Sequence, residues 1–316
     1  SPKFSNPGIN GYFYTSWYDG NNKSFYTKDE LEKHKTNIKT ILNNKGNSKI
    51  GKTLYVGKGS NAPRHKVKLF VGLAIALFAI IKYFGSAETN PYTGKEQHIT
   101  ISEEQEIAIG LQSIPSMKQQ YGGLYPNNNY QAFLDQVGQK LVNYSIAKET
   151  GYQYDFHLLA DSNTINAFAL PGGQIFITYA LFSKLENKDQ LAGVIGHEIG
   201  HVVGRHSADR ISKQGLTEGL LSGVAVALDP NTAQGAAAIA SIINMKYGRE
   251  DELESDDLGV LFMINAGYNP EEMIGVMEIL KAAAGNNNVP EFQSTHPDPE
   301  NRIQKIKEAI NKYKKS

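Results

Sequence analysis

The feature that most constrains this chain is the uninterrupted apolar run Leu69–Ile81, which has no polar face to present to water. Extended to Val67–Phe84 it covers 18 residues, or about 27 Å of helix, close to the roughly 30 Å apolar core of a bilayer. Lys68 and Lys82 lie near its ends, where their side chains can reach lipid headgroups. A buried core helix is the alternative, but basic residues at both ends disfavour it, and the long preceding segment disfavours a cleaved signal peptide. The run therefore predicts one membrane-spanning helix.

The charge of the chain divides at the same place. Net charge is zero, yet residues 1–68 carry thirteen Lys and Arg against four Asp and Glu, and the remainder carries nineteen against twenty-eight. Because Arg64, Lys66 and Lys68 crowd the N-terminal flank of the apolar run, the positive-inside rule places residues 1–66 in the cytoplasm. We therefore expect a single-pass membrane protein whose C-terminal bulk lies outside the cytoplasm.

Residues 1–66 predict a small basic module whose role the sequence does not indicate. Two aromatic stretches, 12–18 and 24–27, flank a turn sequence and are typical of a β-hairpin, and a polar helix is expected at 28–43. Residues 46–53 match a phosphate-binding loop, but strand and turn rather than a helix follow, so we expect no nucleotide. Aromatic residues among lysines are interpreted as a minimal core with a solvated rim, with nucleic-acid or lipid contact as the alternative. We expect no nucleic-acid partner.

The larger part of the chain, 98–316, follows a turn-rich linker at 85–97 and is interpreted as one domain. A short strand pair is expected at 154–159 and 174–178. The pattern otherwise favours helices, at roughly 102–121, 127–146, 187–207, 216–228, 231–246, 249–266, 270–284 and 298–314. This arrangement predicts an α+β fold that is mainly helical with a small sheet.

A metal-binding motif, His197-Glu198-Ile-Gly-His201, lies in the middle of the helix expected at 187–207. His197 and His201 are one turn apart on one helical face, so both imidazoles can bind a single tetrahedral zinc ion. Glu198 projects beside them and can act as general base toward the attacking water. The alternative is a pair of surface histidines on an ordinary helix. The chain has no cysteine, which excludes disulfide scaffolds, thiolate metal sites and cysteine proteases.

A third zinc ligand has to come from elsewhere in the chain, because zinc hydrolases use three protein ligands. The helix expected at 249–266 carries Glu252 and Asp256, which are four residues apart and share a face. One carboxylate can bind zinc while the other accepts the ring N–H of a ligand histidine. Their acidic neighbours Glu250 and Asp251 are interpreted as a solvated face.

These motifs resemble those of the membrane-associated zinc metalloproteases with HExxH and ExxxD motifs, which include the HtpX, CAAX prenyl protease, Oma-type and BepA-type enzymes. The resemblance covers about residues 90–316 and is closest to the extracytoplasmic BepA-like branch. Its landmarks are segments 166–176 and 196–206, the Glu252–Asp256 pair, and Ser294-Thr-His296-Pro with Arg302.

The resemblance implies a zincin-like fold with Glu252 as the third zinc ligand and Asp256 as an outer partner of a ligand histidine. The turn at 294–299 and the cap of the helix after it place His296 and Arg302 so that both can point into one cleft. The resemblance implies that they stabilise negative charge on the substrate carbonyl oxygen there, with Arg302 also able to pair with a site carboxylate. For His296 a second role stays open, as a fourth zinc ligand that holds the enzyme latent. The implied location is the bacterial periplasm or cell envelope, with the mitochondrial inner membrane less favoured.

We therefore expect a zinc-dependent endopeptidase, with one zinc ion per chain, that acts on misfolded or misassembled envelope proteins. The strand at 174–178 is interpreted as an exposed edge that binds unfolded or extended polypeptide as an added strand. The expected substrate-binding residues are Gly172, Gly173, Gln174, Ile175 and Phe176. A chaperone or assembly factor that uses zinc for stability, with latent or lost proteolysis, is the alternative, although the intact Glu198 argues against loss.

Overall fold

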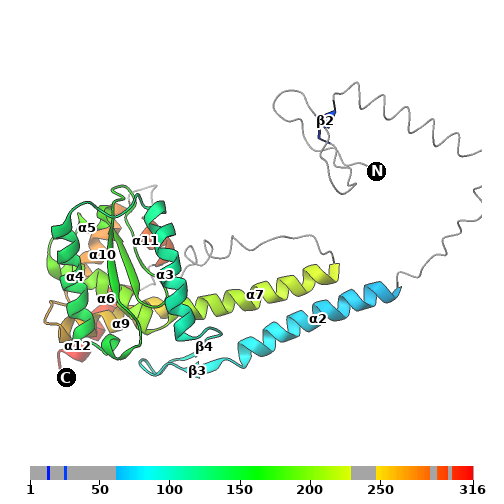
Figure 1. Ribbon diagram of the computed structural model, residues 1–316. Helices are drawn as coiled ribbons and strands as arrows, with labels where there is room; N and C mark the ends of the chain where they lie inside the picture. The colour runs from blue at the N-terminus through cyan, green and yellow to red at the C-terminus, as the bar shows by residue number, and fades with distance from the viewer. Residues whose placement is uncertain are drawn as a thin grey trace, which may run out of the picture. The chain divides into compact units, whose positions relative to one another are not determined.

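The computed structural model describes residues 62–228, 247–284, 290–297 and 301–315, together with the pairs 13–14 and 25–26 (Figure 1). By its internal contacts the chain divides into two compact units, Ser1–Pro63 and Arg64–Ser316. In the first unit, β1 (Phe13–Tyr14) pairs antiparallel with β2 (Phe25–Tyr26), as the predicted hairpin requires. The helix expected at 28–43 and the segment 46–53 lie outside the described residues.

The apolar run lies in helix α2 (Ala62–Phe84), and most side chains of its segment 67–84 are exposed. Its segment Val67–Phe84 has a mean hydropathy of 2.1, and only 6% of that segment is buried. Among the helices that the structure describes, this is the one long and apolar enough to cross a membrane. Phe70 and Phe78, about 70% exposed, show how much apolar surface the helix offers to its surroundings.

Residues 85–97, expected to be a linker, form most of a β-hairpin instead. Strand β3 (Ala87–Thr89) pairs antiparallel with β4 (Glu96–His98). The Asn90 side chain accepts hydrogen bonds from the backbone N–H of Tyr92 and of Thr93, and Gly94 adopts a φ of 74°, which closes the turn. The turn was visible in the sequence, whereas two polar strands of three residues leave no hydrophobic alternation to detect.

A three-stranded sheet with the order β5-β7-β6 forms the centre of the second unit. β5 (Asp155–Leu159) runs parallel to β7 (Gln174–Thr178), and β6 (Ala167–Ala169) runs antiparallel to β7. Alternate residues point to opposite faces, and both faces are apolar. One face packs on α4 (Asn128–Asn143) and α6 (Lys188–Val203), and the other on α3 (Glu103–Gln120); Figure 1 shows α4 and α3 on opposite sides of the sheet.

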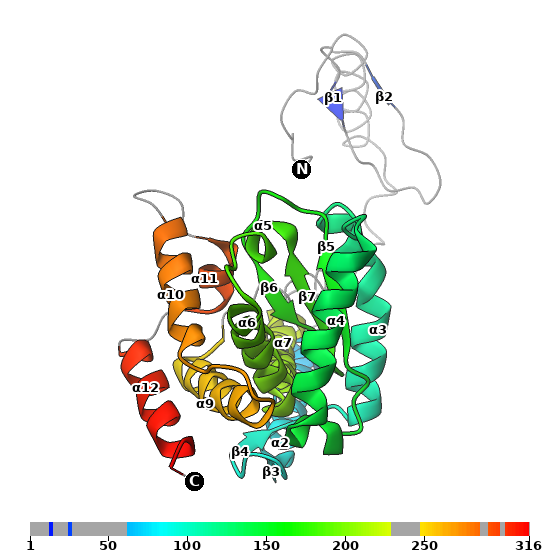
Figure 2. The same ribbon diagram turned by 90° about the vertical axis from the view of Figure 1, so that its left-hand side faces the viewer.

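Two of the C-terminal helices pack on α6 (Figure 2). α9 (Arg249–Asn265) and α10 (Glu272–Ala283) both contact α6, and α12 (Arg302–Tyr313) lies on α9. The short α11 (Glu291–Thr295) leads into His296, and α5 (Tyr179–Phe182) follows β7. The helix expected at 231–246 lies outside the described residues. The observed order of helices around a small mixed sheet agrees with the predicted mainly helical α+β fold.

The approach of α9 to α6 depends on glycine. A Cβ atom added to Gly200 would lie 2.9 Å from backbone atoms of Ser255, and one added to Gly196 would lie 3.4 Å from the backbone of Gly259. Any larger residue at Gly200 would therefore push the helices apart. This close packing brings the carboxylates of α9 to the histidines of α6.

Candidate metal centre and active site

Helix α6 begins where its sequence predicts and is buried almost throughout. The Asn187 side chain accepts hydrogen bonds from the backbone N–H of Asp189 and of Gln190, which caps the helix. Fourteen of the sixteen residues of α6 are buried, His197, Glu198 and His201 among them. Buried polar side chains require hydrogen-bond or ionic partners, so the chemistry of His197, Glu198 and His201 depends on the side chains that contact them.

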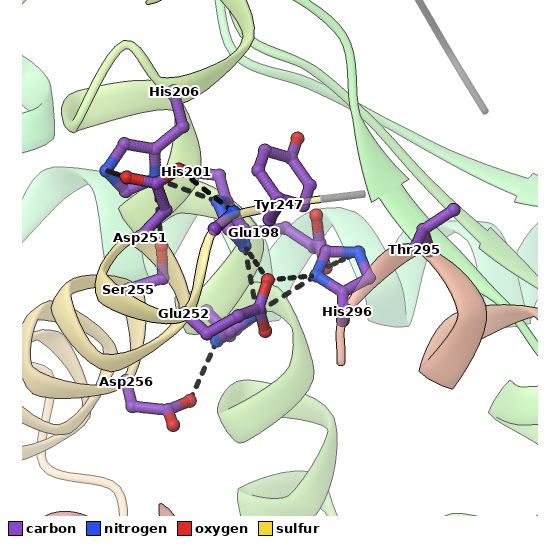
Figure 3. A network of polar contacts seen from close by, with 12 residues as sticks. Glu198, His201, His206, Tyr247, Asp251, Glu252, Ser255, Asp256, Thr295 and His296 are labelled. Carbon is purple, nitrogen blue, oxygen red and sulfur yellow. Dashed lines mark hydrogen bonds and ion pairs between the residues drawn. The ribbon is translucent and has the colours of Figure 1, made fainter. Parts of the chain in front are cut away.

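Four potential ligand atoms converge beside α6. His197 Nε2 lies 3.0 Å from His201 Nε2 and 3.5 Å from Glu252 Oε2, and His201 Nε2 lies 3.4 Å from Glu252 Oε1. His296 Nδ1 lies 3.1 Å from Glu252 Oε1 and 3.4 Å from His197 Nε2. Figure 3 shows the Glu252 carboxylate between His201 and His296. Ligand atoms around tetrahedral zinc would be about 3.3 Å apart, given bonds of about 2.0–2.1 Å, so this group could hold a metal ion.

Several polar atoms at this point are buried and lack a hydrogen-bond partner within the described part of the chain. They are both carboxylate oxygens of Glu198, Oε2 of Glu252 and Nε2 of His296. Unpaired buried carboxylate oxygens are costly, and a cation or a water molecule between them would remove that cost. The donor set and its unpaired atoms therefore fit a zinc ion with a water beside Glu198.

The ionisation of two of the ligands, His201 and Glu252, favours metal binding, whereas the pKa of His197 is raised, because Asp256 outweighs the effect of burial. Burial lowers the pKa of His201 well below its usual value, so its imidazole is neutral and retains a lone pair. Burial would raise the pKa of Glu252, but the neighbouring His296 and His201 lower it well below the usual range, so this ligand stays ionised. Burial raises the pKa of the Glu198 carboxyl, which suits a group that must take up a proton.

His197 is held by a carboxylate and an arginine. Its Nδ1 lies 2.9 Å from Asp256 Oδ1, the outer partnership expected from the sequence. Arg302 donates from Nε to Asp256 Oδ2 at 2.7 Å and from NH2 to Asp256 Oδ1 at 2.9 Å, and its NH1 lies 3.4 Å from Glu252 Oε2. Arg302 thus fixes both acidic side chains of the site.

This position of Arg302 agrees with one of its two expected roles. Arg302 is 3% exposed and is paired with the two carboxylates, and it does not line the small cavity beside the site. The pairing with a site carboxylate is therefore observed, whereas the shared cleft with His296 is not. The physical reason is that α12 begins at Arg302, after Asn301 at a φ of 70°, and its first residue meets α9.

His201 is supported by residues that the sequence analysis did not single out. Its Nδ1 lies 2.9 Å from Nδ1 of His206, and the Tyr247 ring stacks on its imidazole with centroids 3.7 Å apart. The Arg210 guanidinium covers the Tyr247 ring at 3.5 Å. The available signal for His206 was its place five residues after His201, but a straight helix would have carried it away from the metal-binding face.

A break in the helix brings His206 back. α6 ends at Val203, Arg205 adopts a left-handed φ of 55°, and α7 (His206–Leu228) begins at once. The sequence predicted one helix through residue 207, so this break is a correction. It places the His206 ring against the backbone of Gly204, where an added Cβ would come within 2.4 Å of Nε2.

Comparison with known proteins agrees with this geometry. Peptidase family M48 matches residues 128–310, the segment that holds α6, α9 and His296. The chain belongs to peptidase family M48. The predicted family resemblance is therefore confirmed, and with it the expected class of enzyme, a metallopeptidase.

Several curated relatives resemble this M48 chain over most of its length. The beta-barrel assembly-enhancing protease of Escherichia coli (strain K12) is 28% identical over 243 residues, 72% of this chain and 48% of the relative. The mitochondrial metalloendopeptidase OMA1 of Schizosaccharomyces pombe is 25% identical over 252 residues, 78% of this chain and 73% of the relative. The human mitochondrial metalloendopeptidase OMA1 is 25% identical over 279 residues, which are 79% of this chain and 51% of the relative. The chain spans about half the length of the beta-barrel assembly-enhancing proteases that it matches.

The strand expected to be an exposed edge is the central strand of the sheet. β7 is flanked by β5 and β6, and all five of its residues are buried. Gly172 and Gly173 adopt φ values of 79° and 101°, and a Cβ on Gly172 would lie 2.5 Å from the backbone of Ile107. The expected edge is therefore wrong, because the segment before β7 folds back as β6 and covers it. These two glycines serve a tight turn against α3.

The edge of the sheet beside the metal centre is β6. A cavity of about 20 Å³ lies between β6 and α11, lined by Phe168, Ala169, Tyr247 and His296 among others. That volume admits about one water molecule and no polypeptide. As far as the described residues go, the centre is therefore closed to polypeptide, and its histidines and Glu198 are buried.

Proposed function

We propose that this M48 chain is a zinc-dependent metalloendopeptidase that binds one zinc ion through His197, His201 and Glu252. The observation that carries the proposal is the set of ligand atoms 3.0–3.5 Å apart, with the unpaired carboxylate of Glu198 beside them. Ordinary buried ion pairs would not leave both oxygens of a glutamate without hydrogen bonds.

The chain's own residues have separate tasks in peptide hydrolysis. When bound, zinc would polarise the peptide carbonyl and lower the pKa of the attacking water. Glu198 accepts the proton of that water and returns it to the nitrogen of the leaving amine. Asp256, fixed by Arg302, holds the ring of His197 in the orientation that aims Nε2 at the metal position.

The role of His296 follows from its two ring nitrogens. Nδ1 lies at ligand distance from the other metal-binding atoms, while Nε2 lies 3.7 Å from Glu198 Oε1. With the closed cavity, this geometry favours a latent state in which His296 would bind zinc together with His197, His201 and Glu252. Replacing His296 by Ala should then raise hydrolysis, whereas a role in stabilising the oxyanion predicts a loss of about a hundredfold.

Substrate is proposed to add as a strand to β6. At the two ends of β6, Thr178 N donates to Asn166 O and Leu170 N donates to Gln174 O. The even-numbered residues of the β6 segment therefore form the hydrogen bonds to β7. The N–H and C=O groups of Ala167 and Ala169 therefore point away from β7, toward the metal centre. Backbone pairing of this kind selects extended polypeptide over a defined sequence. Phe292 of α11 donates its backbone N–H to Ile165 O at 3.1 Å, so α11 has to move for substrate to enter.

The proposed substrates are misfolded or misassembled envelope proteins. This proposal is supported by the name of the relative from Escherichia coli, a beta-barrel assembly-enhancing protease, and by the exposed apolar helix α2. We propose that α2 spans a membrane with residues 1–66 in the cytoplasm and the M48 domain in the periplasm or cell envelope. A reporter fused after Ser316 should be active outside the cytoplasm and one fused before Phe4 inside it; the opposite result would overturn this topology.

Casein digestion tests the proposal against the chaperone or assembly factor. Because the centre is closed, four proteins are compared: wild type, Glu198→Gln, His296→Ala, and the double variant Glu198→Gln/His296→Ala. Glu198→Gln should abolish hydrolysis whether or not His296 is replaced, while zinc content, measured by elemental analysis, stays at one per chain. Zinc should be lost in the double variant His197→Ala/His201→Ala. Zinc binding without hydrolysis in any background would favour the chaperone.

A further inference from the structure

The hairpin that follows α2 is joined to the end of the metal-binding helix. Asn90, in the hairpin turn, donates from its side chain to Val203 O at 2.9 Å, and this bond is buried. Arg205, at the break after α6, pairs with Glu88 of β3 and with Glu106 of α3. The helix that carries two of the proposed ligands thus ends against the segment closest to the apolar helix.

A second connection reaches a proposed ligand itself. Lys95 Nζ lies 2.9 Å from Asp251 Oδ1 and 3.1 Å from Glu254 Oε2. Glu254 Oε2 lies 2.9 Å from His206 Nε2, and His206 Nδ1 lies 2.9 Å from His201 Nδ1. Figure 3 shows His206 and Asp251 beside His201, on the side away from His296. These contacts form one chain from the hairpin to His201.

The donors and acceptors in this chain can be ordered in only one way when both imidazoles are neutral. An ionised Glu254 only accepts, so His206 carries its proton on Nε2 and its Nδ1 has a lone pair. His201 then donates its Nδ1 proton to His206, which leaves the lone pair of His201 on Nε2, the atom in the metal-binding group. Glu254 thereby selects the tautomer of His201 that can bind metal.

The same residues also have the chemistry of a second metal site, since His206, Asp251 and Glu254 bring potential ligand atoms together. The Lys95 ammonium, however, lies within 3.1 Å of both carboxylates and supplies the positive charge there. Asp251, expected on a solvated face, is instead 9% exposed and pairs with Lys95. Lys95 is therefore the cation of this cluster.

We propose that Glu254, held by Lys95 of the hairpin, is a positioning residue that acts through His206 to orient and polarise the zinc ligand His201. The proposal rests on the proposed function, because it assumes that His201 binds zinc. It gives the segment next to the apolar helix a direct influence on the metal centre, through hydrogen bonds to a ligand rather than through contact with substrate.

Zinc affinity of the full chain in detergent, measured by competition with a chelator, tests the proposal. Glu254→Ala should weaken zinc binding by about 10- to 100-fold, as removal of an outer partner does. Glu254→Gln, whose amide oxygen still accepts from His206, should restore most of that loss. Lys95→Met should cause a smaller loss, of about threefold. The matched controls are Glu271→Ala and Lys314→Met, which break an exposed ion pair and should leave affinity unchanged.

The outcomes distinguish a failure of the positioning role of Glu254 from a failure of the proposed zinc-dependent function. If wild type binds no zinc, the proposed metal centre fails; if wild type binds zinc and Glu254→Ala binds it equally well, only the positioning role fails. Absorption of the cobalt-substituted protein adds a spectroscopic reading, and it should change in Glu254→Ala but not in Glu271→Ala. Should Glu254→Ala fail to fold, Lys95→Met remains as the test, with Lys314→Met as its control. Zinc affinity of Lys95→Met equal to that of wild type would overturn the proposal.

Discussion

Helices α2 and α6 are both apolar, yet their surroundings are opposite. In α6, fourteen of sixteen residues are covered by protein, whereas only 6% of the segment Val67–Phe84 of α2 is buried. An apolar composition predicts only that a helix avoids water. Whether protein or lipid covers the helix has to be predicted from its other residues. In α6 those residues are glycines that admit α9, and in α2 they are the lysines near its two ends. The same hydrophobic effect thus builds a buried core around one helix, whereas the other helix keeps an apolar surface that is able to face lipid.

The sharpest test of this contrast places one charge in each helix. Ile195→Asp in α6 would bury an unpaired carboxylate in the core, and we expect the folded unit to be lost, at a cost of about 4 kcal/mol or more. Leu77→Asp in α2, at a position 56% exposed, should leave the unit folded in detergent. Thermal unfolding followed by circular dichroism measures both. Equal destabilisation by the two changes would mean that α2 is a core helix.

The next effect, smaller for each substituted residue, concerns the insertion of α2 into a membrane. Leu73→Arg with Leu77→Arg should weaken insertion of α2 by about 3 kcal/mol for each substitution, because a charge in the middle of a spanning helix is costly. The protein should then appear in the soluble fraction after alkaline extraction of membranes. The control is Leu111→Arg, at an exposed position of α3, which should remain with the membranes. Retention of the double variant would contradict a spanning α2.

The smallest expected effect separates the glycines. Gly200→Ala brings a methyl group within 2.9 Å of the Ser255 backbone and should lower the free energy of unfolding by about 1–3 kcal/mol. Gly215→Ala, in α7, meets nothing within 4 Å and should raise it by roughly 0.5–1 kcal/mol through helix propensity. Denaturant titration of both variants checks the signs. A neutral Gly200→Ala would show that α9 can move away from α6 without cost.

Much of the candidate site could be predicted because it depends on local spacing. His197 and His201 share a face by helical periodicity, Glu252 and Asp256 do so on a second helix, and the Asn187 cap marks where the first helix begins. These relations involve residues within one or two turns, where backbone geometry alone determines the direction of side chains. The apolar run followed the same logic, since composition over eighteen residues is a local property.

The remaining features depend on contacts between distant segments. The edge position of β6, a strand of three residues, is decided by its pairing with β7 rather than by its own pattern. Arg302 meets Asp256 because α12 lies on α9, a contact across 46 residues that no periodicity shows. His206 reaches His201 only because Arg205 breaks the helix with a left-handed backbone, a conformation that few arginines adopt.

The wide separation along the chain of the four potential ligands has a consequence for biogenesis. His197 and His201 precede Glu252 by about fifty residues and His296 by about a hundred. During synthesis the histidine pair is therefore complete long before its partners exist, and the Arg302–Asp256 pair closes only when the last helix has been made. A chain that is still being synthesised therefore lacks the assembled centre. The order of the ligands along the chain thus delays hydrolytic capacity until α12 has been made and has folded onto α9.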